Sequence, residues 1–464
     1  MSKMIKGLFA NIGIFSLTTF TSRFLSFLIL PLYTFYLTTE EYGTIDLVNT
    51  AISLMFPVLS LSICDAVLRF GIGNNNDNKT IFSLGLNVIL AGSSIGVVLI
   101  PLFLFFGIKI NIIFYGIVIF FFQGLNSLFA SFCKAINETK KMALITLMIT
   151  FTTLLLNVVL VAKLHMDING YWISTILGNI VGLILYIYWC KFYKYYYFDV
   201  KMFKSQLFKE MLIYAIPLIP NALFWWINSS LDRLVLTTMT SVSIVGLYAC
   251  ANKIPTIIST ISSIFSQAWT LSIFQSDSKQ RKKFFEQTYL FYNEILFSFT
   301  IVVIYLSKFL GSLLFSKDFF VAWTFVPILT AGVYYNSLNS VIGSVFNAHN
   351  NSAFIFRTTV YGSLTNIILN IPLVYFYGAM GAAIATLISY FIVWIVRVRK
   401  IKQLYDYRIN YRNALFQMLC LYIVIVLILL YSNWSFSMIL VFGYCIYSSL
   451  KYLFPVINRI FKKS

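Results

Sequence analysis

Long apolar runs alternate with short polar clusters along the whole chain. A membrane-spanning helix needs about 20 mostly apolar residues, and polar residues that recur three or four positions apart within it share one face. Fourteen runs satisfy this length: 9–37, 44–71, 80–106, 111–136, 141–163, 169–190, 210–237, 243–272, 284–314, 320–347, 353–376, 379–399, 412–431 and 433–455. The pattern therefore predicts an all-α, polytopic membrane protein with about 14 transmembrane helices.

The placement of charge predicts how these helices are oriented. Charged residues make up 11% of the chain, well below the ~25% of soluble domains, and Lys and Arg number 34 against 15 Asp and Glu. If both termini are cytoplasmic, 27 of the 34 basic residues fall in inner loops and tails, four in outer loops and three within spans. Because basic residues concentrate on the cytoplasmic side of membrane proteins, we expect both termini to be cytoplasmic.

Composition and spacing also exclude several classes of function. No basic helix or basic–aromatic patch stands apart to bind nucleic acid. The outer loops are short, paired catalytic carboxylates are missing, the six cysteines form no CxxC spacing, and the two histidines are isolated. We therefore expect neither an enzyme nor a resident metal or cofactor.

An internal repeat divides the chain. The stretches "LLLNVVLV" (154–161) and "IILNIPLV" (367–374) match at an offset of 213 residues, and Gly170-x-x-Ile-x-Thr matches Gly381-x-x-Ile-x-Thr at an offset of 211. Two further stretches that begin with "LTT" share Gly-x5-Asn, which ends at Asn49 and Asn252, and we predict both asparagines as substrate-binding residues. Six spans per repeat give two halves of the same orientation, and such parallel repeats enclose a central site in transporters.

The repeat gives a domain scheme. We predict an N-terminal six-helix lobe (1–190), a cytoplasmic linker (191–209), a C-terminal six-helix lobe (210–400), and appended helices 13–14 with a basic tail (401–464). The linker is basic and rich in aromatic residues. It is either an amphipathic segment held on the membrane surface by anionic lipid, or a solvated loop.

Ionisable residues inside spans indicate the predicted binding site. Arg23, Arg233 and Lys253 are costly at membrane depth unless they meet water or an anion, and polar stripes on helices of both halves suggest a hydrated cavity. Asp232 can pair with one of these basic residues, either Arg233 or Lys253. Adjacent residues on a helix point in different directions, which favours Lys253 without deciding between the two. The alternative is that these residues form structural ion pairs at the membrane interface.

Two acidic residues are candidates for coupling to a proton or sodium gradient. Glu294 lies deep in the ninth predicted span, and Asp65 lies in the second. Asp65 has an alternative role as an ion-pair partner of Arg69, one helical turn later.

Four stretches carry a family resemblance: "SRFLSFLILPLYTFYLTTEEYGTIDL" (22–47), "NSSLDRLVLTTM" (228–239), "VGLYACANKI" (245–254) and the two LN-x-x-LV repeats. The chain resembles the Wzx-type O-antigen or capsule repeat-unit flippases, in the polysaccharide-transporter branch of the multidrug/oligosaccharidyl-lipid/polysaccharide exporters. The resemblance implies a two-lobed exporter of the bacterial inner membrane, with basic residues at Arg23 and Arg233.

The same resemblance implies a substrate and partners. The substrate would be an undecaprenyl-pyrophosphate-linked oligosaccharide of O-antigen, lipopolysaccharide or capsule biosynthesis, moved from the cytoplasmic to the outer leaflet by alternating access. A polysaccharide polymerase and a chain-length regulator would act with it. The alternatives are an exporter of lipid II or of small molecules with the same fold, and a membrane polysaccharide polymerase.

Overall fold

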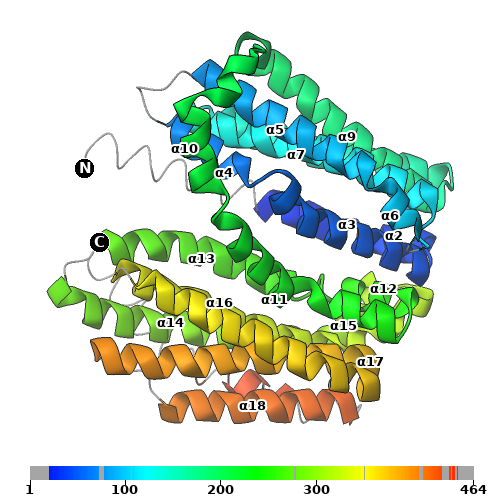
Figure 1. The fold of residues 1–464 in the computed structure, drawn as a ribbon. Helices are drawn as coiled ribbons and strands as arrows, with labels where there is room; N and C mark the ends of the chain where they lie inside the picture. Colours follow the sequence, from blue (N-terminus) through cyan, green and yellow to red (C-terminus); the bar gives the residue numbers. More distant parts are fainter. Residues whose placement is uncertain are drawn as a thin grey trace. The chain divides into compact units, whose positions relative to one another are not determined.

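A computed structural model describes residues 20–72, 78–105, 107–275, 278–349, 351–406, 411–430, 438–439, 441–444 and 447. Every regular element among these residues is a helix, which confirms the predicted all-α fold class. Residues 20–28 are helical and precede the elements labelled in Figure 1. These elements are α2 (Leu30–Tyr36), α3 (Thr39–Leu59), α4 (Ile63–Gly71), α5 (Asn78–Val98), α6 (Ile100–Phe105), α7 (Ile110–Ala135), α8 (Thr139–Asn157), the π-helix η1 (Val158–Lys163), α9 (Asp167–Trp189), the 3-10 helices η2 (Phe192–Lys194) and η3 (Val200–Lys204), α10 (Gln206–Ala215), α11 (Leu218–Met239), α12 (Val242–Ala251), α13 (Thr256–Gln275), α14 (Ser278–Tyr305), α15 (Ser307–Leu314), the 3-10 helix η4 (Lys317–Thr324), α16 (Val326–Ala348), α17 (Ser352–Tyr405) and α18 (Tyr411–Leu430).

Several of these helices can cross a membrane. In the described residues, nine helical segments are long and apolar enough, or up to 11 if each of two bent pairs forms one span. The count takes α17 as a single segment, although it covers two predicted spans, 353–376 and 379–399. The first and last predicted spans lie partly outside the described residues, so the total of 14 stays a prediction.

Helix α17 is a hairpin of two antiparallel limbs. Gly378 has a φ of 55° and a ψ of −133°, a backbone conformation that glycine adopts without steric cost and that breaks the helix. Asn366 donates to the Thr386 hydroxyl at 3.2 Å, whereas 20 residues of straight helix would separate them by about 30 Å. A Cβ on Gly381 would lie 1.9 Å from the Leu373 carbonyl oxygen, so only glycine allows the limbs to approach this closely.

The structure supports the internal repeat at the level of single contacts. Asn126 on α7 donates to the Asn179 carbonyl at 3.0 Å, and Asn339 on α16 donates to the Tyr390 carbonyl at 2.9 Å. The donors are related by the offset of 213 residues found in the sequence, and the acceptors by the offset of 211. Both halves therefore repeat the same interhelical hydrogen bond.

A second pair of equivalent contacts lies in the two helical hairpins. Gly170 on α9 approaches Leu160 of η1 closely, and Gly381 approaches Leu373 in the same way. Each glycine carries no side chain at the point where two backbones meet, which explains why the repeated motif contains glycine at this position.

Each of the two stretches that begin with "LTT" contains a helix start. Thr38 caps α3 in a reciprocal capping box with Glu41, and Ser241 caps α12. The offset between Thr38 and Ser241 equals the offset between Asn49 and Asn252. Such side chains satisfy backbone N–H groups that a helix start otherwise leaves without partners. Beyond the caps the two helices differ, because α3 continues to Leu59 whereas α12 ends at Ala251.

Several predicted spans are broken helices rather than continuous ones. The predicted span 44–71 divides into α3 and α4, with positive φ values at Leu61 (51°) and Ser62 (49°) between them. The predicted span 243–272 divides into α12 and α13, which are bent by 49° at a break that contains Pro255. Proline cannot donate the helical hydrogen bond, so this break has a local cause.

Internal contacts divide the chain into unit 1 (Met1–Ser230) and unit 2 (Leu231–Ser464), with the division inside α11. In unit 1, α7 packs against α4, α5 and α9 around an apolar core. In unit 2, α16 is the most buried helix and contacts α13, α14, α17 and α18 (Figure 1). The predicted limits of the lobes and of the linker differ from this division and stay predictions.

Candidate functional site

Asp232 and Arg233 on α11 form an ion pair in unit 2. The Arg233 guanidinium lies 3.4 Å from Asp232 Oδ1, and the Tyr248 hydroxyl of α12 donates to Asp232 Oδ2 at 2.5 Å. Of the two partners that the sequence left open for Asp232, the structure pairs it with Arg233, and the alternative favoured by helix geometry, Lys253, is wrong. The arginine side chain is long enough to reach back to the preceding carboxylate, although the two Cβ atoms point in different directions.

A series of buried polar side chains leads from α17 to this carboxylate. Asn370 donates to Asn366 at 3.1 Å, and Asn366 donates to Thr386 on the second limb of α17. Thr386 interacts with Tyr248, whose hydroxyl binds Asp232. All of these groups lie within unit 2, and hydrogen bonds that align in this way strengthen one another at low dielectric.

Lys253 and Asn252 occupy the break between α12 and α13. Both are partly buried, and the Asn252 side chain donates to the Tyr248 carbonyl at 2.9 Å. None of the ion pairs between described residues includes Lys253. A helix break exposes backbone groups and side chains that a continuous span would hide.

The other predicted substrate residues belong to unit 1. Arg23 is exposed, and Asn49 on α3 donates to the Tyr171 hydroxyl of α9 at 3.1 Å. The Tyr33 ring of α2 packs edge-on against Tyr171, with 5.7 Å between centroids. The repeat-related asparagines Asn49 and Asn252 therefore make different contacts in the two units.

Asp65 is exposed in the first turn of α4. Its proposed ion pair with Arg69 does not occur among the described residues, because the Arg69 guanidinium lies over the Tyr214 ring of α10, 4.2 Å from its centroid. The alternative role of Asp65 as a partner of Arg69 is therefore wrong.

Glu294 on α14 is fully buried and accepts hydrogen bonds from three side chains. Oε1 accepts from Asn413 at 2.5 Å and from Gln417 at 3.1 Å, both on α18, and Oε2 accepts from the Tyr444 hydroxyl at 2.7 Å. These donors come from the two helices that were predicted as an appended hairpin. The hairpin is thus attached to the C-terminal half through a carboxylate.

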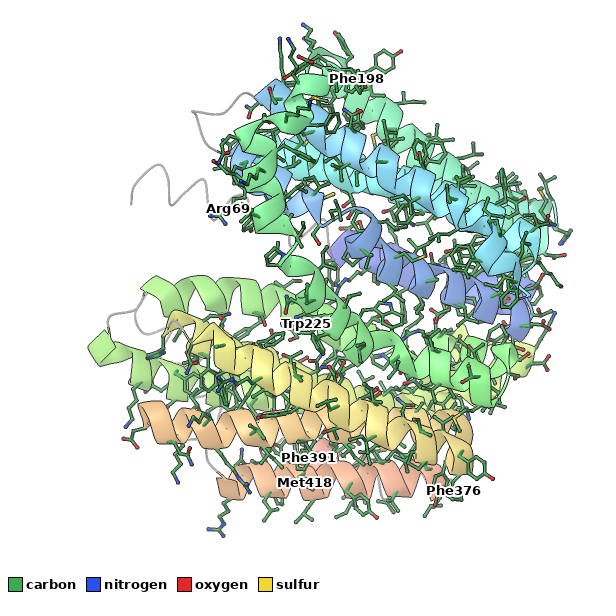
Figure 2. All side chains as sticks on the ribbon, viewed as in Figure 1. Arg69, Phe198, Trp225, Phe376, Phe391 and Met418 are labelled. Atoms are coloured by element: carbon green, nitrogen blue, oxygen red, sulfur yellow. The ribbon has the colours of Figure 1, made fainter. Side chains whose placement is uncertain are left out.

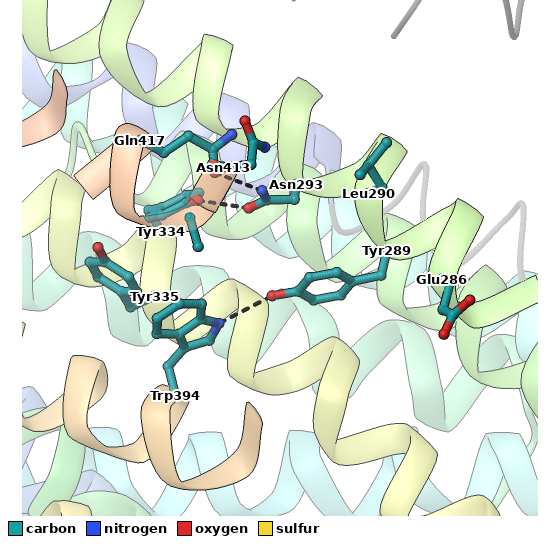
Figure 3. Close-up of a pocket in the computed structure, with 10 residues that line it drawn as sticks. Glu286, Tyr289, Leu290, Asn293, Tyr334, Tyr335, Trp394, Asn413 and Gln417 are labelled. Carbon is teal, nitrogen blue, oxygen red and sulfur yellow. Dashed lines mark hydrogen bonds between the residues drawn. The ribbon is translucent and has the colours of Figure 1, made fainter. Parts of the chain in front are cut away.

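A small cavity adjoins this network. Its volume is about 30 Å³, enough for a water molecule, and its lining includes Glu286, Asn293, Tyr334 and Gln417 (Figure 3). Tyr334 donates to Asn293 at 2.7 Å, and Asn293 donates to Gln417 at 2.8 Å. The hydrogen bonds from Tyr334 to Gln417 and onward to Glu294 connect the cavity with the buried carboxylate.

Sequence reasoning missed two residues of unit 2. Tyr248 lies inside the quoted stretch 245–254 but carries no charge that would single it out. Arg397 was counted as an inner-loop residue, yet it is 6% exposed and donates to the Thr358 hydroxyl at 3.0 Å and the Asn339 carbonyl at 2.8 Å. Its counterpart by the 211-residue offset is Tyr186, so this charge is not shared by the two halves.

The charged side chains described above are suited to recognising charge and binding ions. No group of three or more metal-ligating His, Cys, Asp or Glu side chains exists within the described residues. The chain instead offers basic groups in both units and two buried carboxylates in unit 2.

Comparisons with known proteins add an independent line of evidence. Residues 8–270 match a family described as "Polysaccharide biosynthesis protein". A curated relative from Haloferax volcanii, "Probable low-salt glycan biosynthesis flippase Agl15", is 30% identical over 176 residues, which is 36% of this chain and 35% of the relative. The chain spans less than half the length of the curated relatives that it matches.

Solved structures agree on the fold. "Lipid II flippase MurJ, inward closed conformation" superposes with a TM-score of 0.70 at 18% identity and covers 95% of this chain and 99% of that one. A multidrug resistance MATE family transporter of the MOP superfamily, in an inward-facing conformation, gives a TM-score of 0.66 at 14% identity, with coverage of 84% and 99%. At these identities the similarity concerns the fold.

Proposed function

We propose, from the premise that the chain belongs to the family of polysaccharide biosynthesis proteins, that it is a flippase for a lipid-linked oligosaccharide. The chain is a membrane transporter of the multidrug/oligosaccharidyl-lipid/polysaccharide exporter (MOP) superfamily and not an enzyme. The proposed cargo is an undecaprenyl-pyrophosphate-linked repeat unit of O-antigen or capsule, carried from the cytoplasmic to the outer leaflet of a bacterial inner membrane. A polymerase and a chain-length regulator are the proposed partners.

The family match carries this proposal, and the glycan biosynthesis flippase among the relatives supports it. Physical chemistry explains why such a cargo needs a protein. The charges and hydroxyl groups of a sugar pyrophosphate would have to shed water to cross hydrocarbon, at a cost of several kcal/mol for each polar group. A hydrated chamber with basic walls removes most of that cost.

We assign the basic residues to recognition of the pyrophosphate. Arg23 and Lys253 are the principal proposed contacts. Arg233 is a further proposed contact, whose charge Asp232 partly neutralises. Asn49 and Asn252 are proposed hydrogen-bonding contacts to the sugar or phosphate. Each unit thus contributes one principal basic contact and one asparagine to the proposed recognition of the cargo.

We propose Glu294 as the group that binds the coupling ion, a proton or sodium. It is buried at the end of a hydrogen-bond series that begins at a water-sized cavity, whereas Asp65 is exposed at one end of α4. A buried carboxylate that accepts hydrogen bonds from amide and hydroxyl groups can bind a proton or a monovalent cation. Asp65 is therefore the weaker of the two predicted coupling residues.

The test uses purified protein in vesicles with a fluorescently labelled polyprenyl-pyrophosphate oligosaccharide. The fraction of probe reachable by a membrane-impermeant quencher reports transport between leaflets. We expect Arg23→Glu and Lys253→Glu to lower the transport rate at least tenfold. The matched control is Lys140→Glu, which reverses the charge of an exposed lysine beside the α7–α8 connection and should keep the wild-type rate. Wild-type transport by both Arg23→Glu and Lys253→Glu would overturn the proposal.

A further inference from the structure

The segment between α9 and α10 is folded onto one end of unit 1. The Phe192 ring of η2 packs 5.2 Å from the ring centroids of Phe82 and Phe129, and Met202 of η3 is 4% exposed. Phe192 and Met202 belong to the apolar core formed by α4, α5 and α7. The segment is therefore anchored from beneath by apolar side chains.

Hydrogen bonds hold the middle of this segment in place. The Ser83 hydroxyl of α5 donates to the Tyr195 carbonyl at 3.2 Å and accepts from the Tyr197 amide at 3.0 Å. The hydroxyls of Thr80 and Tyr197 lie 2.7 Å apart. Because Thr80 and Ser83 lie in the first turns of a helix of membrane-spanning length, the segment lies at the level where that helix ends.

The outer side of the segment combines large apolar and basic side chains. Phe198 and Val200 are each 63% exposed and Tyr193 is 58% exposed, and Figure 2 shows Phe198 pointing away from the helices. The lysines of the segment are exposed as well: Lys191, Lys194, Lys201 and Lys204. Asp199 is the only acidic residue between positions 191 and 204, and it caps η3 by accepting from the Lys201 amide.

More basic residues flank the segment. Lys79 precedes Thr80, and Lys134 follows Cys133, whose sulfur lies 3.4 Å from that of Cys190 at the start of the segment. Basic residues at the start of α5 and at the end of α7 therefore adjoin those of the segment at the same end of unit 1.

We propose that this linker surface, formed by Lys191, Tyr193, Lys194, Phe198, Val200, Lys201 and Lys204, binds the headgroups of anionic phospholipids. A solvated loop would gain nothing from holding phenylalanine and valine outward, whereas aromatic side chains favour the membrane–water interface. Lysines next to them attract anionic headgroups, each by about a fivefold preference. Since the segment is already folded, little conformational entropy is lost when lipid binds.

The test measures phospholipid retained by the purified full-length protein. The protein is equilibrated with equal amounts of phosphatidylglycerol and phosphatidylcholine, and native mass spectrometry counts the molecules of each that remain bound. We expect phosphatidylglycerol to be retained at least tenfold over phosphatidylcholine. In the variant K191Q/K194Q/K201Q/K204Q, the ratio of retained phosphatidylglycerol to phosphatidylcholine should fall at least tenfold. The variant F198S/V200S should retain less of both lipids.

The matched control is K109Q/K163Q/K308Q/K317Q, which removes an equal number of positive charges from the predicted outer loops. It should keep the wild-type preference within about twofold. Equal losses in the two quadruple variants would show a general effect of net charge and overturn the proposal, as would wild-type retention in the linker variant. If the linker variant does not fold, K194Q/K201Q replaces it, with an expected loss of at least fivefold.

Discussion

Replacing Glu294 with alanine should release α18 from the rest of unit 2. The substitution removes the acceptor of three hydrogen bonds, from Asn413, Gln417 and Tyr444. Hydrogen bonds between helices in membranes contribute about 0.6 kcal/mol each on average and up to about 1.7. The three together give about 2–5 kcal/mol, and the donors stay buried without the carboxylate.

Hydrogen exchange of the backbone amides of α18 is the appropriate assay, because it reports local opening rather than global unfolding. A loss of 2–5 kcal/mol corresponds to exchange faster by about 30-fold to a few thousandfold, at tenfold for each 1.4 kcal/mol. Glu294→Gln keeps one acceptor oxygen and should give an intermediate rate. Glu210→Ala, which removes an exposed carboxylate on α10, is the control and should leave α18 unchanged.

Exchange in residues 411–430 within twofold of wild type in Glu294→Ala would refute this reasoning. It would mean that apolar packing, such as the contact between the Phe297 and Tyr444 rings at 4.8 Å, holds the helix pair without the carboxylate.

Three further predictions concern local geometry. Gly381→Val should abolish folded protein after detergent extraction, as measured by size-exclusion chromatography, because the valine Cβ would overlap the Leu373 carbonyl. The control Gly443→Val, at a position with open space around it, should yield folded protein. Arg397→Leu should lower the free energy of unfolding by about 3 kcal/mol or more by leaving buried acceptors without donors, and unchanged thermal stability would contradict this. Mild oxidation should join Cys133 to Cys190 in a disulfide, because their sulfurs are 3.4 Å apart, and the intact mass should fall by two hydrogens. Cys133→Ser should prevent this loss of mass. Free thiols at Cys133 and Cys190 in the oxidised protein would refute the prediction.

The sequence predicted those parts of the fold that depend on local periodicity. The helical class and the two halves followed from apolar runs and matched motifs, and the structure repeats the contact of Asn126 in that of Asn339. The break at Gly378 also falls between two predicted spans. These features are local because, inside a bilayer, a spanning helix satisfies its backbone hydrogen bonds within its own segment.

The candidate site was predicted less completely. The sequence identified Asp232, Arg233 and Glu294 from the cost of charge in an apolar run. It did not decide between Arg233 and Lys253 as the partner of Asp232, and it gave no sign that α18 binds Glu294. It also missed Tyr248, which is uncharged, and Arg397, which lies near the end of a helix. The free-energy cost of burying a charge in an apolar span indicates that an ionisable residue needs a partner, but it does not indicate which neighbouring side chain is that partner.

Taken alone, the sequence determined that the chain is helical and that its two halves share one plan. Only the tertiary structure decided which buried polar groups meet, as with the donors of Glu294 and the folded linker on unit 1. The physical reason is that an apolar side chain suits lipid and a neighbouring helix almost equally, so hydrophobic patterns fix the depth of a helix but not its neighbours. Partners are selected by shape and by hydrogen bonds between segments that are far apart in the chain.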